Sequence, residues 1–277
     1  MSAAPLPGYE RRCFTHEGAS HDVYRAGSLQ APPLLLMHEL PGVAPGLLLF
    51  AERLRAAGFQ VHIPHLFGVV GQRQPLRNIV RLCVSREFAY LRAGVSAPVT
   101  RWLRALVAQI SADNAGGNVG VIGMCLTGAF VIPLILHPSV VAAVAAQPSV
   151  PLSALHLLTG SEGGEQAAAL NVSADDIAAA RTRLQTGESH LLAVRCRADR
   201  LCPADKLQRL QQEFPVGLQL REYGTEQQRN AIGARPHAIY TKEYRLANEA
   251  DADHPSRQAY ADLLLFLRTH LPLRQPQ

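Results

Sequence analysis

Hydrophobic and polar positions along the chain fall into two alternating kinds of segment. Short runs rich in apolar residues, which predict strands, lie at 33–38, 59–63, 119–124, 141–146, 191–197 and 218–223. Between them, segments such as 47–57 and 98–112 repeat apolar residues at helical spacing. Strands that are apolar on both faces are typical of a parallel sheet covered by helices. The pattern therefore predicts an α/β fold, a mainly parallel sheet with helices on both faces.

The remaining segments complete this prediction. Two short strands at 11–16 and 21–25, separated by Glu17-Gly18-Ala19-Ser20, predict a hairpin at the edge of the sheet. Further helices are predicted at 73–94, 126–136, 173–184, 203–214 and 256–271, and a loop at 225–236. Ser173, followed by Asp175 and Asp176, is a typical N-cap sequence. No repeat or linker divides the chain, so we expect one domain over 1–277, with a small cap-like insertion at about 153–187.

Composition narrows the class of protein. Hydrophobic residues make up 48% of the chain and charged residues 18%, as in a folded globular protein with a sizeable core. The net charge of +5 comes from scattered arginines rather than from a basic run, so we expect no nucleic-acid partner. The charge-free stretch 119–136 contains three glycines and Pro133 and predicts a buried strand and helix rather than a membrane span. We expect a small-molecule partner and a monomer or homodimer.

Cysteine usage and the first residues indicate the compartment. The five cysteines form no CxxC pair and are odd in number, which favours a reduced, cytoplasmic chain. The segment 1–12 has no hydrophobic core, so we expect no signal peptide.

The strongest chemical signal is the stretch Gly120-Val121-Ile122-Gly123-Met124-Cys125-Leu126-Thr127-Gly128. An apolar run ends in small residues around one reactive side chain, and a second apolar segment follows. This order is typical of a strand that turns sharply into a helix and exposes a nucleophile on a strained elbow. A buried strand cysteine is the alternative, but glycines are unfavourable inside an ordinary strand. We interpret Cys125 as a nucleophile.

Other titratable residues follow the predicted strands. Glu39 lies just after the strand at 33–38, Asp199 just after that at 191–197, and His237 in the loop before the last helix. Ligands of parallel sheets bind where the carboxyl ends of the strands meet, so these side chains can converge on Cys125. The chain order nucleophile, acid, histidine is that of α/β hydrolases.

On these residues the chain resembles the dienelactone hydrolase family of α/β hydrolases, from about Leu34 to Leu271. The resemblance is carried by four segments: His38-Glu39-Leu40-Pro41-Gly42-Val43, Gly123-Met124-Cys125-Leu126-Thr127-Gly128, Ala198-Asp199-Arg200-Leu201-Cys202-Pro203 and Pro236-His237-Ala238-Ile239. Two features depart from the family pattern. Thr127 stands where the elbow usually has a second glycine, and 153–187 separates the nucleophile from the acid.

The resemblance implies a role for each matching residue. Cys125 would be the nucleophile, His237 the base and Asp199 the acid that orients it. Glu39 would hold the thiol and help to activate it. The backbone N–H groups of Leu40 and Leu126 would form the oxyanion hole.

The family binds a substrate carboxylate with arginine, and the region 73–104 is rich in arginine. Arg81 and Arg86 are the candidates there, against the plainer interpretation of a solvated face. No metal or organic cofactor is implied.

Several residues have competing interpretations. His254, before Pro255, is a rival base, but it is expected at an exposed helix N-cap. His38 beside Glu39 is more consistent with a pocket or core residue than with a metal ligand. His62 and His65 lack a third ligand nearby. Cys196 and Cys202 bracket Asp199, and the interpretation as a buried strand cysteine and a loop cysteine is favoured over metal ligands.

The sequence thus predicts an ester or lactone hydrolase that forms a thioester on Cys125. Two alternatives stay open. One is a thioesterase or acyl transferase on the same fold. The other is a non-catalytic protein that binds a ligand or senses oxidants through this thiol.

Overall fold

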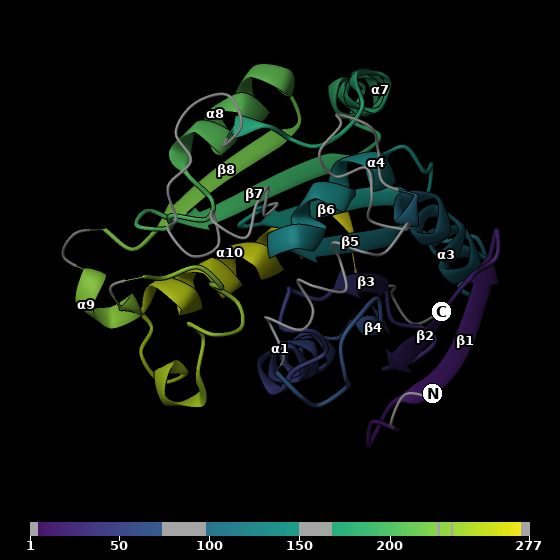
Figure 1. Ribbon diagram of the computed structural model, residues 1–277, viewed down its shortest axis with the longest axis horizontal. Helices are drawn as coiled ribbons and strands as arrows, with labels where there is room; N and C mark the ends of the chain where they lie inside the picture. Colours follow the sequence, from purple (N-terminus) through teal and green to yellow (C-terminus); the bar gives the residue numbers. More distant parts are fainter. Residues whose placement is uncertain (1–4, 74–97, 150–167, 226–227, 234, 273–277) are drawn as a thin grey trace.

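The computed structural model describes residues 5–73, 98–149, 168–225, 228–233 and 235–272. Within these residues one sheet runs through the molecule (Figure 1). Its strands are β1 (Glu10–His16), β2 (Ala19–Ala26), β3 (Pro33–Met37), β4 (Gln60–Pro64), β5 (Val119–Met124), β6 (Val140–Ala146), β7 (His190–Cys196) and β8 (Leu218–Tyr223). Their order is β1-β2-β4-β3-β5-β6-β7-β8. The strands from β4 to β8 are parallel, while β1 and β2 are antiparallel to their neighbours.

Helices cover both faces of this sheet. The described helices are α1 (Pro45–Ala56), α3 (Val99–Asp113), α4 (Val131–Ile135), α7 (Ala174–Gln185), α8 (Ala204–Glu213), α9 (Arg229–Ile232) and α10 (Pro255–His270). Two 3₁₀ segments, η2 (Cys125–Phe130) and η3 (Leu246–Asn248), join them. Helices α3, α4, α7 and α8 contribute to the core on one face, and α1 and α10 to the core on the other. The predicted α/β-hydrolase fold is confirmed.

Burial along the central strands explains why they are apolar throughout. In β3, Leu35 and Met37 belong to one core while Leu34 and Leu36 belong to the other. All four are 0% exposed. Successive side chains of a strand point to opposite faces, so a strand covered on both sides must be apolar at every position.

The hairpin prediction is confirmed, and so are the predicted parallel strands, within one or two residues at their ends. Strands β1 and β2 pair with Glu10 opposite Arg25 and are joined through Glu17 and Gly18. Both turn residues have positive φ, 46° and 78°, as a tight hairpin turn requires.

The helix expected at 126–136 is only partly α-helical. It begins as the 3₁₀ segment η2 and becomes the α-helix α4 only at Val131. Pro133 has no N–H to donate to the carbonyl of Ala129, four residues earlier, so α-helical hydrogen bonding is interrupted at this point. The loop expected at 225–236 contains the short helix α9.

Part of the expected insertion belongs to the core. Ser173 caps α7, with its side chain accepting a hydrogen bond from the Asp176 backbone N–H. Ala180 and Leu184 of α7 are buried among core residues of α4. The predicted helix of residues 73–94 lies almost entirely outside the described residues, and so do Arg81 and Arg86. None of the described helices is both long and apolar enough to cross a membrane.

Candidate active site

Cys125 lies at the carboxyl end of β5 on a strained turn. Its φ is +54°, which is unusual for a residue with a side chain. The turn is tight enough that a Cβ atom on Gly123 would lie 2.3 Å from the backbone oxygen of Thr127. Glycine is therefore required at 123, as the elbow prediction implied.

Thr127 fits the turn through its hydroxyl group. Its Oγ1 accepts a hydrogen bond from the Met124 N–H at 2.9 Å. The same oxygen lies 3.0 Å from the Met124 carbonyl and 3.3 Å from that of Met37, so its proton can be donated to either. Thr127 is 0% exposed. The hydroxyl therefore ties the ends of β3 and β5 to the elbow, a contact that glycine could not make.

Glycine is required one residue later for a different reason. A Cβ atom on Gly128 would lie 2.9 Å from the Cα of Pro148, in the segment that follows β6. The backbone of that segment thus passes directly over the elbow.

His237 and Asp199 are held together although 38 residues separate them. Asp199 Oδ2 lies 2.7 Å from His237 Nδ1, and the other carboxylate oxygen accepts hydrogen bonds from the N–H groups of Leu201 and Cys202 at 2.9 and 3.2 Å. The Asp199 side chain is 1% exposed and that of His237 is 17% exposed. The carboxylate thus fixes the imidazole with Nδ1 as the donor and Nε2 free to accept a proton.

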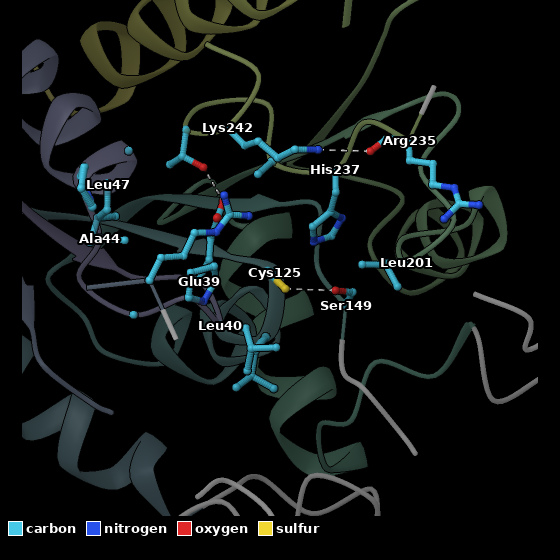
Figure 2. A pocket seen from close by; sticks show the side chains of 18 residues that line it. Glu39, Leu40, Ala44, Leu47, Cys125, Ser149, Leu201, Arg235, His237 and Lys242 are labelled. Carbon is cyan, nitrogen blue, oxygen red and sulfur yellow. Dashed lines mark hydrogen bonds between the residues drawn. The ribbon is translucent and has the colours of Figure 1, made fainter. Parts of the chain in front are cut away.

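The imidazole of His237 faces Cys125 across the cavity (Figure 2). Its Nε2 atom is buried and has no hydrogen-bond partner among the described residues. Burial by itself lowers the pKa of His237, but the neighbouring Cys125 sulfur and the Asp199 carboxylate outweigh it and raise that pKa well above its ordinary value. The sulfur and the carboxylate that flank the imidazole therefore stabilise a proton held by His237.

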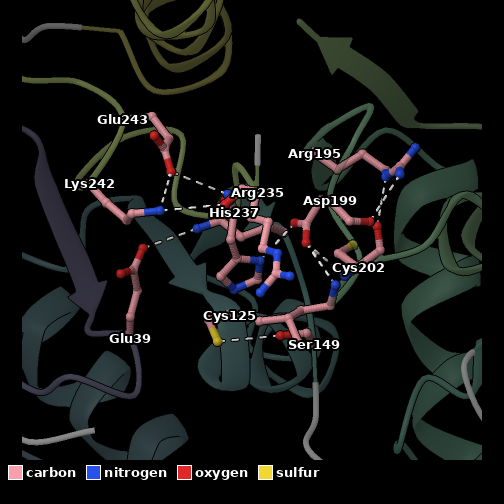
Figure 3. A network of polar contacts seen from close by, with 12 residues as sticks. Glu39, Cys125, Ser149, Arg195, Asp199, Cys202, Arg235, His237, Lys242 and Glu243 are labelled. Atoms are coloured by element: carbon pink, nitrogen blue, oxygen red, sulfur yellow. Dashed lines mark hydrogen bonds and ion pairs between the residues drawn. The ribbon is translucent and has the colours of Figure 1, made fainter. Parts of the chain in front are cut away.

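A buried arginine supports the loop that carries Asp199. Arg195 donates from Nε to the Cys202 carbonyl at 2.7 Å and from one terminal nitrogen to the Arg197 carbonyl at 2.8 Å. Its other terminal nitrogen pairs with Glu222 on the edge strand β8. Because Arg195 lies in β7, this arrangement fixes the loop to the sheet (Figure 3).

Glu39 follows β3 and borders the same cavity. Its Oε1 accepts hydrogen bonds from the Gln147 side-chain amide at 3.1 Å and the Thr241 hydroxyl at 3.0 Å. Burial raises the pKa of Glu39, against the opposing effect of His237 and of the Thr241 hydrogen bond. Glu39 is therefore held at the cavity by residues that follow β6 and His237.

The thiol itself contacts Ser149. Cys125 Sγ and Ser149 Oγ are 3.3 Å apart, and the Ser149 N–H donates to the Cys125 carbonyl at 3.0 Å. Cys125 is 8% and Ser149 6% exposed.

These residues open into one cavity of about 550 Å³. Leu40, Leu126, Leu47 and Leu201 provide much of its apolar lining. Cationic side chains also border it; they belong to Arg73, Arg235 and Lys242. Lys242 is paired with Glu243 at 3.1 Å, whereas Arg73 and Arg235 are both exposed. An apolar chamber with cations at its border suits a small organic acid derivative.

The structure brings Cys125, His237, Asp199 and Glu39 together, with Leu40 and Leu126 beside them. Nothing in the sequence motifs pointed to Ser149, Gln147, Thr241 or Lys242. A weak signal existed for the first two, since they follow a predicted strand next to the nucleophile strand.

The rival base lies elsewhere. His254 is the N-cap of α10, as expected, and its Nδ1 accepts from the Ser256 N–H. The expected exposure is wrong, because His254 is only 5% exposed. Its Nε2 lies 3.0 Å from the Ala231 carbonyl, so the side chain is enclosed by α9 and α10.

The other candidates are buried structural residues. His38 accepts from the Leu66 N–H through Nε2 and lies 2.9 Å from the Glu39 carbonyl through Nδ1, and burial lowers its pKa to about 3. His62 bonds to Gln60, and burial lowers its pKa to about 4. Cys196 and Cys202, in β7 and the following loop, are each 0% exposed. Among the residues that the structure describes, no three His, Cys, Asp or Glu side chains are grouped to hold a metal ion.

Comparison with known proteins gives one family match and many structural likenesses. The model of the dienelactone hydrolase family matches residues 22–215, more than half of the chain. No curated protein sequence matches.

Several solved structures share the fold. A proposed dienelactone hydrolase of Klebsiella pneumoniae is 15% identical, with a TM-score of 0.61 and coverage of 93% of this chain and 97% of that one. An esterase of Pyrococcus furiosus is 12% identical, with a TM-score of 0.62 and 98% of both chains covered. A dienelactone hydrolase-like promiscuous phosphotriesterase from metagenomic libraries is 16% identical, with a TM-score of 0.56 and coverage of 93% and 97%. At these identities the likeness shows the fold alone.

Proposed function

The chain belongs to the dienelactone hydrolase family, and from this premise we propose that it hydrolyses carboxylic esters or lactones through a thioester on Cys125. The observation that carries the proposal is the Asp199–His237 contact of 2.7 Å, with the imidazole facing a strained cysteine across the cavity. Nucleophile, base and orienting acid are the parts that covalent acyl transfer needs.

The first half of the reaction acylates the sulfur. His237 Nε2 takes the thiol proton, and the thiolate of Cys125 attacks the carbonyl carbon to form a carbon–sulfur bond. The carbonyl π electrons move to oxygen, where the N–H groups of Leu40 and Leu126 stabilise the charge. Collapse of this intermediate breaks the ester carbon–oxygen bond, and the leaving alkoxide takes the proton from Nε2.

The second half restores the enzyme. Water gives a proton to His237 Nε2 as its oxygen attacks the thioester carbon. The new tetrahedral intermediate expels the thiolate of Cys125, which recovers a proton from Nε2. Asp199 accepts the hydrogen bond from His237 Nδ1 and so keeps Nε2 as the proton-accepting nitrogen. Glu39 borders the same cavity and, as the family resemblance implies, would hold the thiol and help to activate it when substrate arrives.

Replacing Cys125 by alanine tests the proposal. We expect Cys125→Ala to lower turnover of p-nitrophenyl acetate to background, because no second nucleophile would form the acyl-enzyme. Cys196→Ala is the matched control, since Cys196 is a buried cysteine of β7 that does not line the cavity. Acid-quenched wild type should carry an acetyl group on the Cys125 peptide. Full turnover by Cys125→Ala would refute the mechanism.

The cations at the cavity border favour an acidic substrate. Arg73 and Arg235 are exposed there and can pair with a carboxylate of the ester or lactone. We expect Arg235→Ala to raise the KM of an ester with a free carboxylate several-fold and to leave that of its neutral methyl ester unchanged. Arg209→Ala, on the outer surface of α8 and paired with Glu213, is the control. Equal changes for both esters would favour a neutral substrate.

A further inference from the structure

We propose that Ser149 is a further catalytic residue, whose hydroxyl group donates a hydrogen bond to the Cys125 sulfur and stabilises it as the nucleophile. This inference rests on the proposed function, since it assigns a role toward the attacking atom. It arises from the polar contact that the structure gives to the thiol, Sγ to Ser149 Oγ at 3.3 Å.

The position of Ser149 follows from the topology of the sheet. Strands β5 and β6 are parallel neighbours, with Met124 paired to Ala146, so both end at the same level. Each is followed by a residue with positive φ, Cys125 at 54° and Gln147 at 37°. The chain thus turns sharply after both strands, at the carboxyl end of the sheet. The segment that follows β6 passes over the elbow at Cys125.

Each of the three residues after β6 contacts the site. The Gln147 amide donates to Glu39, Pro148 lies against Gly128, and Ser149 is bonded to Cys125. Gln147 is itself held by its N–H, which donates to the Val194 carbonyl of β7 at 2.6 Å. The segment is therefore fixed on both sides, by the elbow and by the next strand.

The backbone fixes Ser149 independently of its side chain. Its N–H donates to the Cys125 carbonyl at 3.0 Å, and Pro148 restricts the preceding backbone. The hydroxyl therefore reaches the sulfur from a position that does not depend on the contact itself. Replacing the side chain by alanine removes the donor without removing the backbone anchor.

The surroundings leave a clear role for this donor. His237 Nε2 has no hydrogen-bond partner among the described residues, and Glu39 is bonded to Gln147 and Thr241 (Figures 2 and 3). Once the thiol proton has moved to Nε2, Ser149 can donate to the thiolate, which accepts stronger hydrogen bonds than a neutral thiol. When sulfur becomes part of the thioester this hydrogen bond weakens, so it favours the nucleophile before attack.

The other groups around the sulfur would be unchanged by the substitution. The charged and titratable ones come from several elements: Glu39 after β3, Asp199 and Cys202 after β7, Arg73, and Arg235, His237 and Lys242 before α10. A Ser149 variant leaves all of these in place.

The test is the pH dependence of alkylation of Cys125 by iodoacetamide, followed on the Cys125 peptide by mass spectrometry. We expect Ser149→Ala to move the inflection of the rate up by about one pH unit, the value of one hydrogen bond to a charged group. Its acylation rate with p-nitrophenyl acetate at neutral pH should fall about 5- to 10-fold. Ser149→Thr, which keeps a hydroxyl group, should retain the wild-type inflection.

Ser189→Ala is the matched control. Ser189 is 0% exposed, and its hydroxyl has no hydrogen-bond partner among the described residues. It directly precedes β7, so it lies at the amino end of the strand, whereas the cavity lies at the carboxyl ends of the strands. We expect no shift in this variant.

Two results would overturn the proposal: an unchanged inflection in Ser149→Ala with a native melting temperature, or an equal shift in Ser149→Thr, which would assign the effect to packing. The alkylation assay does not depend on ester turnover. If Cys125→Ala kept full activity, the proposed function would fall, while the inflection would still report whether Ser149 acts on the sulfur.

Discussion

Replacing Asp199 by asparagine changes the charge of the proposed acid with little change of shape. The Asn carbonyl oxygen can still accept from the N–H groups of Leu201 and Cys202, so the loop should keep its conformation. The amide nitrogen would then face His237 Nδ1, where the carboxylate oxygen lies at 2.7 Å in the wild type. Since an amide nitrogen only donates, the imidazole proton would move to Nε2.

The size of the effect follows from this change of tautomer. With a proton on Nε2 the imidazole cannot take the thiol proton, so we expect kcat for p-nitrophenyl acetate to fall between about 10²- and 10⁴-fold. This corresponds to roughly 3–5.5 kcal/mol of transition-state stabilisation. Stability should change much less, because two of the three hydrogen bonds of Asp199 are retained.

Asp199→Ala separates the two effects. It leaves two N–H groups, those of Leu201 and Cys202, without an acceptor in a partly buried loop. We expect a loss of about 2–4 kcal/mol in the free energy of unfolding, measured by urea denaturation. Asp262→Asn is the control, since Asp262 accepts from the Tyr223 hydroxyl away from the cavity. A kcat of Asp199→Asn within about threefold of wild type, at a native melting temperature, would refute the assigned role of the acid.

Three further predictions concern stability. Thr127→Val leaves the buried Met124 N–H without its acceptor and should cost about 1–3 kcal/mol in urea denaturation; a loss below about 0.5 kcal/mol would contradict the role of the hydroxyl in the elbow. Arg195→Met removes a buried cation from three carbonyls of the loop that carries Asp199, those of Arg197, Asp199 and Cys202, and should lower both the melting temperature and kcat. An unchanged kcat would show that this loop keeps its position without Arg195. The pKa values of His38 and His62 are lowered to about 3 and about 4, so the unfolded chain binds protons before the folded one, and stability present above pH 6.5 is lost as the pH falls. Between pH 7 and pH 5, each of the two histidines should lower the free energy of unfolding by about 2 kcal/mol. In His62→Gln, the loss of stability over this pH range should therefore be smaller by about 2 kcal/mol.

The sequence predicted the order of strands and helices well because the signals are local. A strand buried on both faces must be apolar at each position, and a helix must repeat its apolar residues every three or four positions. The elbow is equally local, since Gly123 and Cys125 act within one turn. The glutamate, the acid and the histidine could be found because each follows a strand end or stands in a recognisable segment of the resembling family.

Other features required the tertiary structure. Thr127 reads in the sequence as a departure from the elbow pattern, but its hydroxyl ties β3 to β5 across the sheet. By sequence, both His254 and His237 are candidates for the base. They differ in space, because one is enclosed by α9 and α10 and the other lies against Asp199.

The cationic side chains at the cavity border are also brought together only by the tertiary structure. Arg235 and Lys242 come from the loop around His237, and Arg73 from a segment more than 160 positions earlier in the chain. Ser149 carries no motif, and its contact with Cys125 exists because β5 and β6 pair in parallel and end together. Periodicity and motifs report what neighbouring residues do to one another, whereas the environment of a reactive atom is set by strand pairing between segments far apart, which no local pattern encodes.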